Sequence, residues 1–209
     1  SPASSATGVG VSSAISATFG EDMDSSTITT STFTLSSSGG SVSGTVSYSN
    51  KAATFTPSSN LSYSTTYTAT ITTGVKDISG NAMSSTYTWS FTTSSAPDTT
   101  APSGSITINS GDSYTNSTTV TLNLSATDNV GVVGYYASTS SSTPTASASG
   151  WNSVTSATSY SGIVSYTLAT GDENKTVYVW YKDSAGNVSS QASDSITLDT
   201  TAPIVTITS

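Results

Sequence analysis

The chain has 209 residues, a formal net charge of −8 and only 8% charged residues, and it contains no Arg, His or Cys. Four isolated lysines cannot neutralise a phosphate backbone, so nucleic acid is excluded as a partner, and no apolar run is long enough for membrane insertion. Without His and Cys the chain lacks the commonest general base, the thiol nucleophile and most transition-metal ligands, so the sequence predicts a protein that is not an enzyme.

Apolar residues alternate with Ser and Thr along most of the chain, which is the pattern of half-buried β-strands. Eleven Tyr, three Trp and four Phe are too many aromatic residues for a disordered linker. The predicted fold class is therefore all-β, with two β-sandwich domains in tandem, residues 1–97 and 98–198.

Six strands are expected in residues 1–97, one fewer than a seven-stranded sandwich needs, so this domain is predicted to lack its own first strand. Turn residues separate the strands. Their inward sets are Ile15/Ala17/Phe19, Phe33/Leu35, Val42/Val46/Tyr48, Ala53/Phe55, Tyr67/Ala69/Ile71 and Tyr87/Trp89/Phe91.

Seven strands are expected in residues 98–198. A loop rich in Ser, Thr and Ala is expected over residues 138–150. The inward sets of the strands are Ile106/Ile108, Val120/Leu122/Leu124/Ala126, Val133/Tyr135, Trp151/Val154, Tyr166/Leu168, Val177/Val179 and Ile196/Leu198.

Both domains carry the same turn phrase before their last strand. It reads Lys-Asp-Ile-Ser-Gly-Asn over residues 76–81 and Lys-Asp-Ser-Ala-Gly-Asn over residues 182–187. Gly at the fifth position suits a turn that needs a positive φ, and Asp at the second can accept hydrogen bonds from backbone N–H groups downstream. The phrase predicts a hairpin turn rather than a ligand site.

The first domain resembles the bacterial Ig-like domains of S-layer proteins and large adhesins. The resemblance rests on turn and core motifs, so it implies the fold and an extracellular or cell-surface location, not an activity. Its motifs are Thr7-Gly8-Val9, residues 15–24, Ala53-Thr54-Phe55-Thr56-Pro57, Tyr63-Ser64-Thr65-Thr66-Tyr67, residues 76–81 and Trp89-Ser90-Phe91-Thr92-Thr93. Residues 126–132 and 177–183 likewise make the second domain resemble a related bacterial Ig-like module.

A linker phrase occurs twice. Asp-Thr-Thr-Ala-Pro spans residues 98–102, where it introduces a strand of the second domain, and recurs 101 residues later over residues 199–203. Domains that resemble the first one open with a strand of the type Val-Thr-x-Thr-Ser, which is absent before Ser1 and present over residues 205–209. We therefore expect residues 199–209 to be a linker followed by a donor strand. The linker residues are Asp98, Pro102, Asp199 and Pro203, and the assembly-strand residues are Ile204, Val205, Thr206, Ile207 and Thr208.

These expectations describe a structural subunit of an extracellular filament or surface assembly. It would polymerise head-to-tail, because its C-terminal strand would complete the first domain of the next copy. The alternatives are a tandem stalk segment of a large cell-surface adhesin or S-layer protein, and an accessory carbohydrate-binding module of an exported enzyme. Trp151, Tyr135 and Tyr136 are the candidate sugar-stacking residues of the last alternative. Expected partners are copies of the chain, with other surface proteins or glycans as further options.

Acidic residues are the remaining candidate ligands. The groups Glu21/Asp22/Asp24 and Asp172/Glu173 lie in turn-like sequence, which favours solvated loops over an acid–base pair. No cofactor is expected, with calcium as the open alternative, because carboxylate oxygens are its preferred ligands. In that alternative Asp98 and Asp199 would bind calcium and rigidify the two junctions, and Asp128 and Asp183 are further loop carboxylates.

Overall fold

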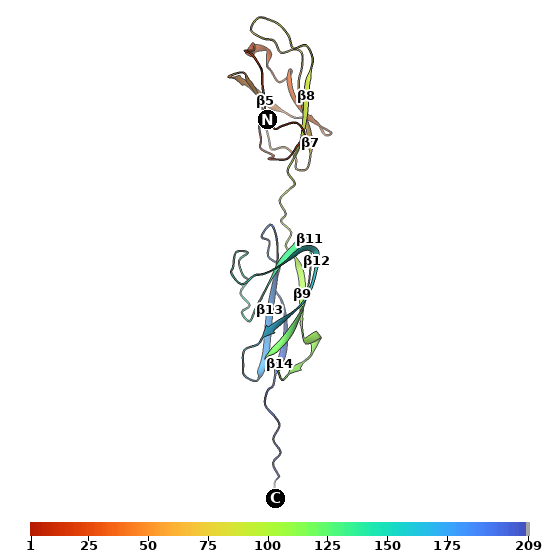
Figure 1. The fold of residues 1–209 in the computed structure, drawn as a ribbon, viewed down its shortest axis with the longest axis vertical. Coiled ribbons are helices and arrows are strands. Elements are labelled where there is room, and N and C mark those ends of the chain that lie inside the picture. Colours follow the sequence, from red (N-terminus) through yellow and green to blue (C-terminus); the bar gives the residue numbers. More distant parts are fainter. Residues whose placement is uncertain (208–209) are drawn as a thin grey trace. The chain divides into compact units, whose positions relative to one another are not determined.

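The structure is a computed structural model that describes residues 1–207. The chain forms two compact units, Ser1–Ala96 and Pro97–Ser209, each with its own hydrophobic core (Figure 1). Strands account for the regular structure of both units apart from two short 3-10 turns, as the alternation predicted. Within the described residues, no helix is long and apolar enough to span a membrane.

The first unit has two sheets that pack face to face. One sheet has the strand order β1-β8-β7-β3-β4 and the other the order β2-β6-β5. Neighbouring strands are antiparallel, except that β1 runs parallel to β8. The elements are β1 (Ala6–Val9), β2 (Ile15–Thr18), the 3-10 turn η1 (Ser25–Thr27), β3 (Phe33–Ser37), β4 (Gly40–Ser41), β5 (Gly44–Ser49), β6 (Ala52–Pro57), β7 (Thr66–Ile71) and β8 (Tyr87–Thr93).

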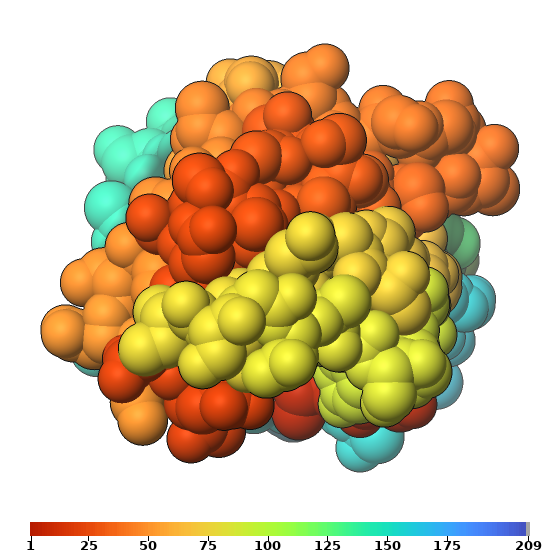
Figure 2. Space-filling view, turned by 90° about the horizontal axis from the view of Figure 1, so that it is seen from above, coloured from red at the N-terminus to blue at the C-terminus, as the bar shows by residue number. Residues whose placement is uncertain are grey.

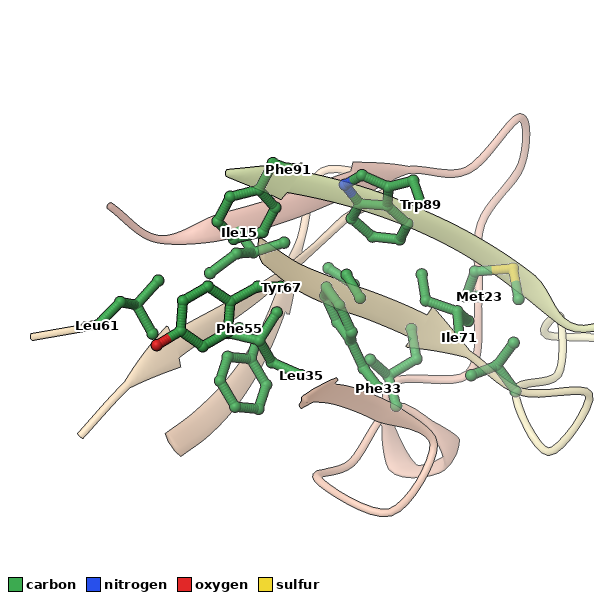
Figure 3. Close-up of a cluster of buried hydrophobic side chains, with 14 residues drawn as sticks. Ile15, Met23, Phe33, Leu35, Phe55, Leu61, Tyr67, Ile71, Trp89 and Phe91 are labelled. Atoms are coloured by element: carbon green, nitrogen blue, oxygen red, sulfur yellow. The ribbon is translucent and has the colours of Figure 1, made fainter. Parts of the chain in front are cut away.

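The core of the first unit is made by the alternate side chains that the sequence pattern singled out (Figure 3). Phe33 lies 5.9 Å, centroid to centroid, from both Phe55 and Trp89, so aromatic rings link the two sheets. Tyr87 was predicted to point inward, and this was wrong, since it is 57% exposed. It shares a strand face with Trp89 but lies beyond the packed core, beside an open groove.

Loop segments close one end of this sandwich. Met23 and Asp77 form an antiparallel bridge, and the Asp24 N–H donates to the Lys76 carbonyl over 2.9 Å. In Figure 2 the yellow segment around residues 75–85 accordingly lies against the orange-red segment around residues 20–30. Val75 and Ile28, buried on these segments, extend the core beyond the strands.

The second unit is organised around one long strand. Its sheet has the order β10-β14-β13-β11-β12, and β9 also pairs with β11. The first half of β11 pairs with β9, and its second half, from Val132 onward, pairs with β13. The elements are β9 (Ser103–Ile108), the 3-10 turn η2 (Asn109–Gly111), β10 (Tyr114–Thr115), β11 (Thr119–Ser138), β12 (Asn152–Thr167), β13 (Glu173–Asp183) and β14 (Ala192–Leu198).

A bulge in β11 marks the change of partner. The register shifts between Thr127 and Val132, and Gly131 within this stretch has a φ of 151°, which favours glycine. Two sets that were predicted as separate strands, around Val120 and around Val133, are therefore halves of one bent strand. The sets around Trp151 and Tyr166 likewise belong to the single strand β12, because β12 follows β11 through the bend.

The twin turn phrases have the predicted geometry. Gly80 and Gly186 have φ angles of 89° and 91°. Asp77 Oδ1 accepts hydrogen bonds from the N–H groups of Ser79 (2.9 Å) and Asn81 (2.7 Å), and Asp183 Oδ1 accepts one from Asn187 (2.8 Å). The predicted turn, with a Gly at positive φ and an Asp that accepts hydrogen bonds from the backbone, is thus confirmed in both units.

Candidate functional site

A groove with a volume of about 500 Å³ runs along the outer edge of β2 in the first unit. Residues 1–4 and 16–20 form one part of its lining. The apolar side chains of Ile71, Met83 and Trp89, with Tyr87, form the rest. Tyr87 and Trp89 lie 5.7 Å apart, centroid to centroid, so this wall of the groove is continuous with the aromatic core.

The backbone of β2 faces this groove. Ser1 and Ser16 exchange two hydrogen bonds, from Ser16 N to Ser1 O (2.6 Å) and from Ser1 N to Ser16 O (2.5 Å), which is the pattern of an antiparallel pair. On the opposite edge, β2 pairs with β6 through Ile15↔Phe55 and Ala17↔Ala53. Because hydrogen-bonding direction alternates along a strand, the backbone N–H and C=O of Thr18 point to the same side as those of Ser16, into the groove.

The second side of the groove is the uncovered end of β8. The parallel strand β1 pairs with β8 at Phe91 and Thr93 and does not reach Tyr87 or Trp89. Two strand edges, one from each sheet, therefore flank an apolar slot. An extended segment is the ligand that such a slot accommodates, since its backbone can pair with an edge while alternate side chains enter the core.

The predicted assembly strand is exposed where the structure describes it. Residues 204–207 form no strand, and Ile204, Val205 and Ile207 are 91–93% exposed. Thr208, the last residue of the predicted strand, lies outside the described residues.

The two linker phrases form the same local turn, but their prolines differ in burial. Asp98 Oδ1 accepts a hydrogen bond from Thr100 N (3.0 Å), and Asp199 Oδ1 accepts one from Thr201 N (3.1 Å). Pro102 is buried, whereas Pro203 is exposed. The predicted linker residues are thus alike in their turns and differ in their packing.

Asp172 holds the second linker phrase against the second unit, a role that the sequence did not indicate. Its Oδ1 accepts hydrogen bonds from the backbone and hydroxyl of Thr200, both over 2.8 Å, and its Oδ2 accepts one from the Thr201 hydroxyl. These donors, with the Thr201 hydroxyl foremost, lower the pKa of Asp172 to about 2. The segment that leads to Ile204 is therefore anchored at its base by an ionised carboxylate.

The other sequence candidates make contacts within their own units. The Nζ of Lys182 lies 4.8 Å above the ring of Trp151, Tyr136 packs edge-on against that ring, and Tyr135 stacks on Tyr160. Asp24 of the group Glu21/Asp22/Asp24 caps η1 by accepting a hydrogen bond from Ser26 N over 2.9 Å. Glu173 pairs with Lys175 over 2.6 Å rather than with Asp172.

Residues 1–93 match the family model of the bacterial Ig-like domain. The first unit is a bacterial Ig-like domain. This confirms the resemblance seen in its turn and core motifs. No curated protein matches the sequence.

Solved structures of bacterial surface proteins show distant similarity. The N-terminal part of the bacterial S-layer protein SbsC is 19% identical with a TM-score of 0.36, and the match covers 93% of this chain and 43% of that one. The fibronectin(III)-like modules of Clostridium thermocellum CbhA are 10% identical with a TM-score of 0.32, covering 95% and 91% of the two chains. The BSP domain of a biofilm associated protein is 16% identical with a TM-score of 0.26, covering 97% and 30%. The chain thus spans less than half of the SbsC structure.

Proposed function

We propose that this protein is a non-catalytic structural subunit of a bacterial extracellular filament or surface assembly, in which residues 204–208 of one copy fill the groove of the Ig-like unit of the next. The observation that carries the proposal is the apolar groove beside the edge of β2, where Ser1 pairs with Ser16 and the backbone of Thr18 faces the groove. The exposed Val205 and Ile207 are its proposed occupants. Because donor segment and acceptor groove belong to different units, the contact is head-to-tail and repeats into an open chain of subunits.

The alternation of the segment fits the face of β2. Residues directly opposite each other in an antiparallel pair project to the same side, and Ala17 and Phe19 on β2 pack against the core. A segment antiparallel to β2 can place Ile207 opposite Ala17 and Val205 opposite Phe19, both pointing inward. In this register Thr208 takes the place of Ser1 opposite Ser16. Burial of the two side chains contributes about 3–6 kcal/mol before the cost of ordering the segment.

A tandem stalk segment of a large cell-surface adhesin or S-layer protein is the second candidate. It is favoured by the first linker phrase, where Asp98 to Pro102 leads directly into β9, the strand that opens the next unit of the same chain. In that arrangement the groove would be filled by a neighbouring domain of one longer polypeptide. Purified residues 1–209 would then stay monomeric.

Disulfide trapping between copies tests the proposal, since the chain has no Cys of its own. In the proposed register Thr206 lies opposite Thr18, with both side chains on the outer face, so the double variant Thr18→Cys/Thr206→Cys should form a ladder of covalent oligomers under oxidising conditions. The distance between paired strands matches the reach of a disulfide.

The matched control is Thr45→Cys/Thr206→Cys. Thr45 is exposed on β5, the other edge strand of the same sheet, where the groove is absent. A ladder from the Thr18 variant alone supports strand donation. No ladder, or equal ladders from both variants, refutes it.

A further inference from the structure

Three aspartates from separate segments of the second unit converge on one point. Asp98 precedes β9, Asp128 lies at the bulge of β11, and Asp183 ends β13. One carboxylate oxygen from each lies within 4.8 Å of the other two. The strand registers bring them together, because Thr127 pairs with Ser103 of β9 and Val132 pairs with Asp183.

Two of these carboxylates keep an oxygen that is buried and has no hydrogen-bond partner, Oδ2 of Asp98 and Oδ2 of Asp128. Asp128 is only 9% exposed. A buried carboxylate oxygen is costly to leave unpaired, so both atoms call for a ligand. These orphaned atoms are an observation independent of the clustering itself.

The remaining oxygens hold the three side chains in place. Asp128 Oδ1 accepts hydrogen bonds from Val130 N (3.0 Å) and Gly131 N (2.6 Å). Asp98 Oδ1 accepts one from the Asn129 side chain at 3.2 Å. Asp183, 2% exposed, is fixed by the backbone and side chain of Asn187.

No cationic side chain compensates the cluster among the described residues. Lys175 pairs with Glu173, and the Nζ of Lys182 donates to the Ala146 carbonyl while lying over Trp151. The other two lysines belong to the first unit. Three carboxylates this close repel one another unless a cation or protons separate them.

We propose that Asp98, Asp128 and Asp183 bind a calcium ion. Two oxygens that each lie 2.3–2.6 Å from one ion are at most about 5 Å apart, which matches the cluster. Calcium suits an all-oxygen donor set in an irregular cage, whereas magnesium requires near-ideal octahedral geometry. The ion would join the segment before β9, the bulge of β11 and the turn after β13, and the inference does not depend on strand donation.

Two aspartates elsewhere in the chain have the same or nearly the same local sequence as two of the proposed ligands and can be compared with them. Asp77 occupies the same turn position in the first unit as Asp183 does in the second, with an equivalent Asn partner, but among the described residues it belongs to no such cluster. Asp199, in the repeated linker phrase, also lies in no carboxylate cluster within residues 1–207. Of the two linker aspartates that were expected to bind calcium at the junctions, Asp98 is the one that lies in this cluster.

Calorimetric titration of the EDTA-treated, desalted protein with CaCl2 tests the proposal. We expect one ion per chain, with an affinity in the range of about 0.1–1 mM that extracellular calcium modules show. Calcium at about ten times that dissociation constant should raise the Tm of the second unit by at least about 4 °C, because it binds the folded state alone. Absence of binding heat together with an unchanged Tm overturns the site, and equal binding of MgCl2 overturns its assignment to calcium.

Asp128→Asn and Asp183→Asn are the test variants, and Asp77→Asn is the control. Each substitution keeps the size of the side chain and one acceptor oxygen, and Asp183→Asn and Asp77→Asn disturb equivalent turns. Calcium affinity should fall about tenfold or more in the first two and stay unchanged in the third. If all three variants bind calcium like the parent, the site is refuted. The parent titration decides the matter should a variant fail to fold.

Discussion

Replacing Ile207 with Ser should weaken association between copies without changing the stability of the monomer. Ile207 is 91% exposed, so nothing in the isolated chain depends on its apolar surface. In the proposed complex the side chain would be buried opposite Ala17, and full burial of an Ile stabilises by about 1.5–3 kcal/mol. Because 1.4 kcal/mol corresponds to a factor of ten, the dissociation constant should rise about 10- to 100-fold.

Ile204→Ser is the matched control for that change. Ile204 has the same 91% exposure and lies in the same segment, but its position in the alternation places it on the outer face of the donated strand. Sedimentation equilibrium over a range of concentrations measures both variants against the parent, and thermal melts check that the monomers are equally stable. Equal effects of the two substitutions would refute the register. No concentration-dependent association of the parent would refute strand donation itself.

Two further predictions concern the second unit. Gly104→Ala should lower the free energy of unfolding of this unit, measured in urea, by about 1–3 kcal/mol, because a Cβ there would overlap the ring of Tyr181 and lie 2.6 Å from the Ser125 carbonyl oxygen. The control Gly20→Ala, in the first unit, should be nearly neutral, because a Cβ at Gly20 has nothing within 4 Å. Asp172 should titrate near pH 2, and because its pKa is lowered in the folded state, its stabilising effect is present above the unfolded pKa of about 3.9 and is lost as the pH falls through 2. The NMR shift of the Thr200 amide, which donates to Asp172 Oδ1, should follow this titration in the parent and lose the step in Asp172→Asn. A midpoint near 4 would contradict the hydrogen-bonded anchor.

Alternation alone predicted most of the core, because a strand with one buried face leaves a period of two in the sequence. Phe33, Leu35 and Phe55 are buried as expected. The division into strands was less predictable in the second unit, where β11 continues through its bulge and pairs with different strands on either side. Whether two apolar sets form two strands or one bent strand is decided by the partner strands, which local periodicity does not encode.

The sequence indicated that the first unit would accept a further strand, but not which residues would line the groove. The repeated linker phrase and the sequence Val205-Thr206-Ile207 indicated a strand that could complete a sandwich. The apolar wall formed by Met83 and Tyr87 comes from a loop and a strand end whose sequence gives no sign of a binding surface. Tyr87 even follows the pattern of a core residue, because alternation records which face a side chain is on and not whether the opposite sheet reaches it.

The twin turns show why the sequence named the proposed calcium ligands only as members of a larger set of loop carboxylates. Asp77 and Asp183 stand in nearly the same phrase, adopt the same turn and accept the same hydrogen bonds from an Asn four residues later. Only Asp183 meets two further carboxylates, because β13 pairs with β11 just beyond the bulge that carries Asp128. The local sequence therefore specifies the turn, while the strand pairing of each unit determines whether the same aspartate only shapes a turn or also becomes an ion ligand. If calcium binds as proposed, Asp183→Asn will cost more stability with calcium than in EDTA, whereas the cost of Asp77→Asn will be the same in both, which separates the shared turn role from the ligand role.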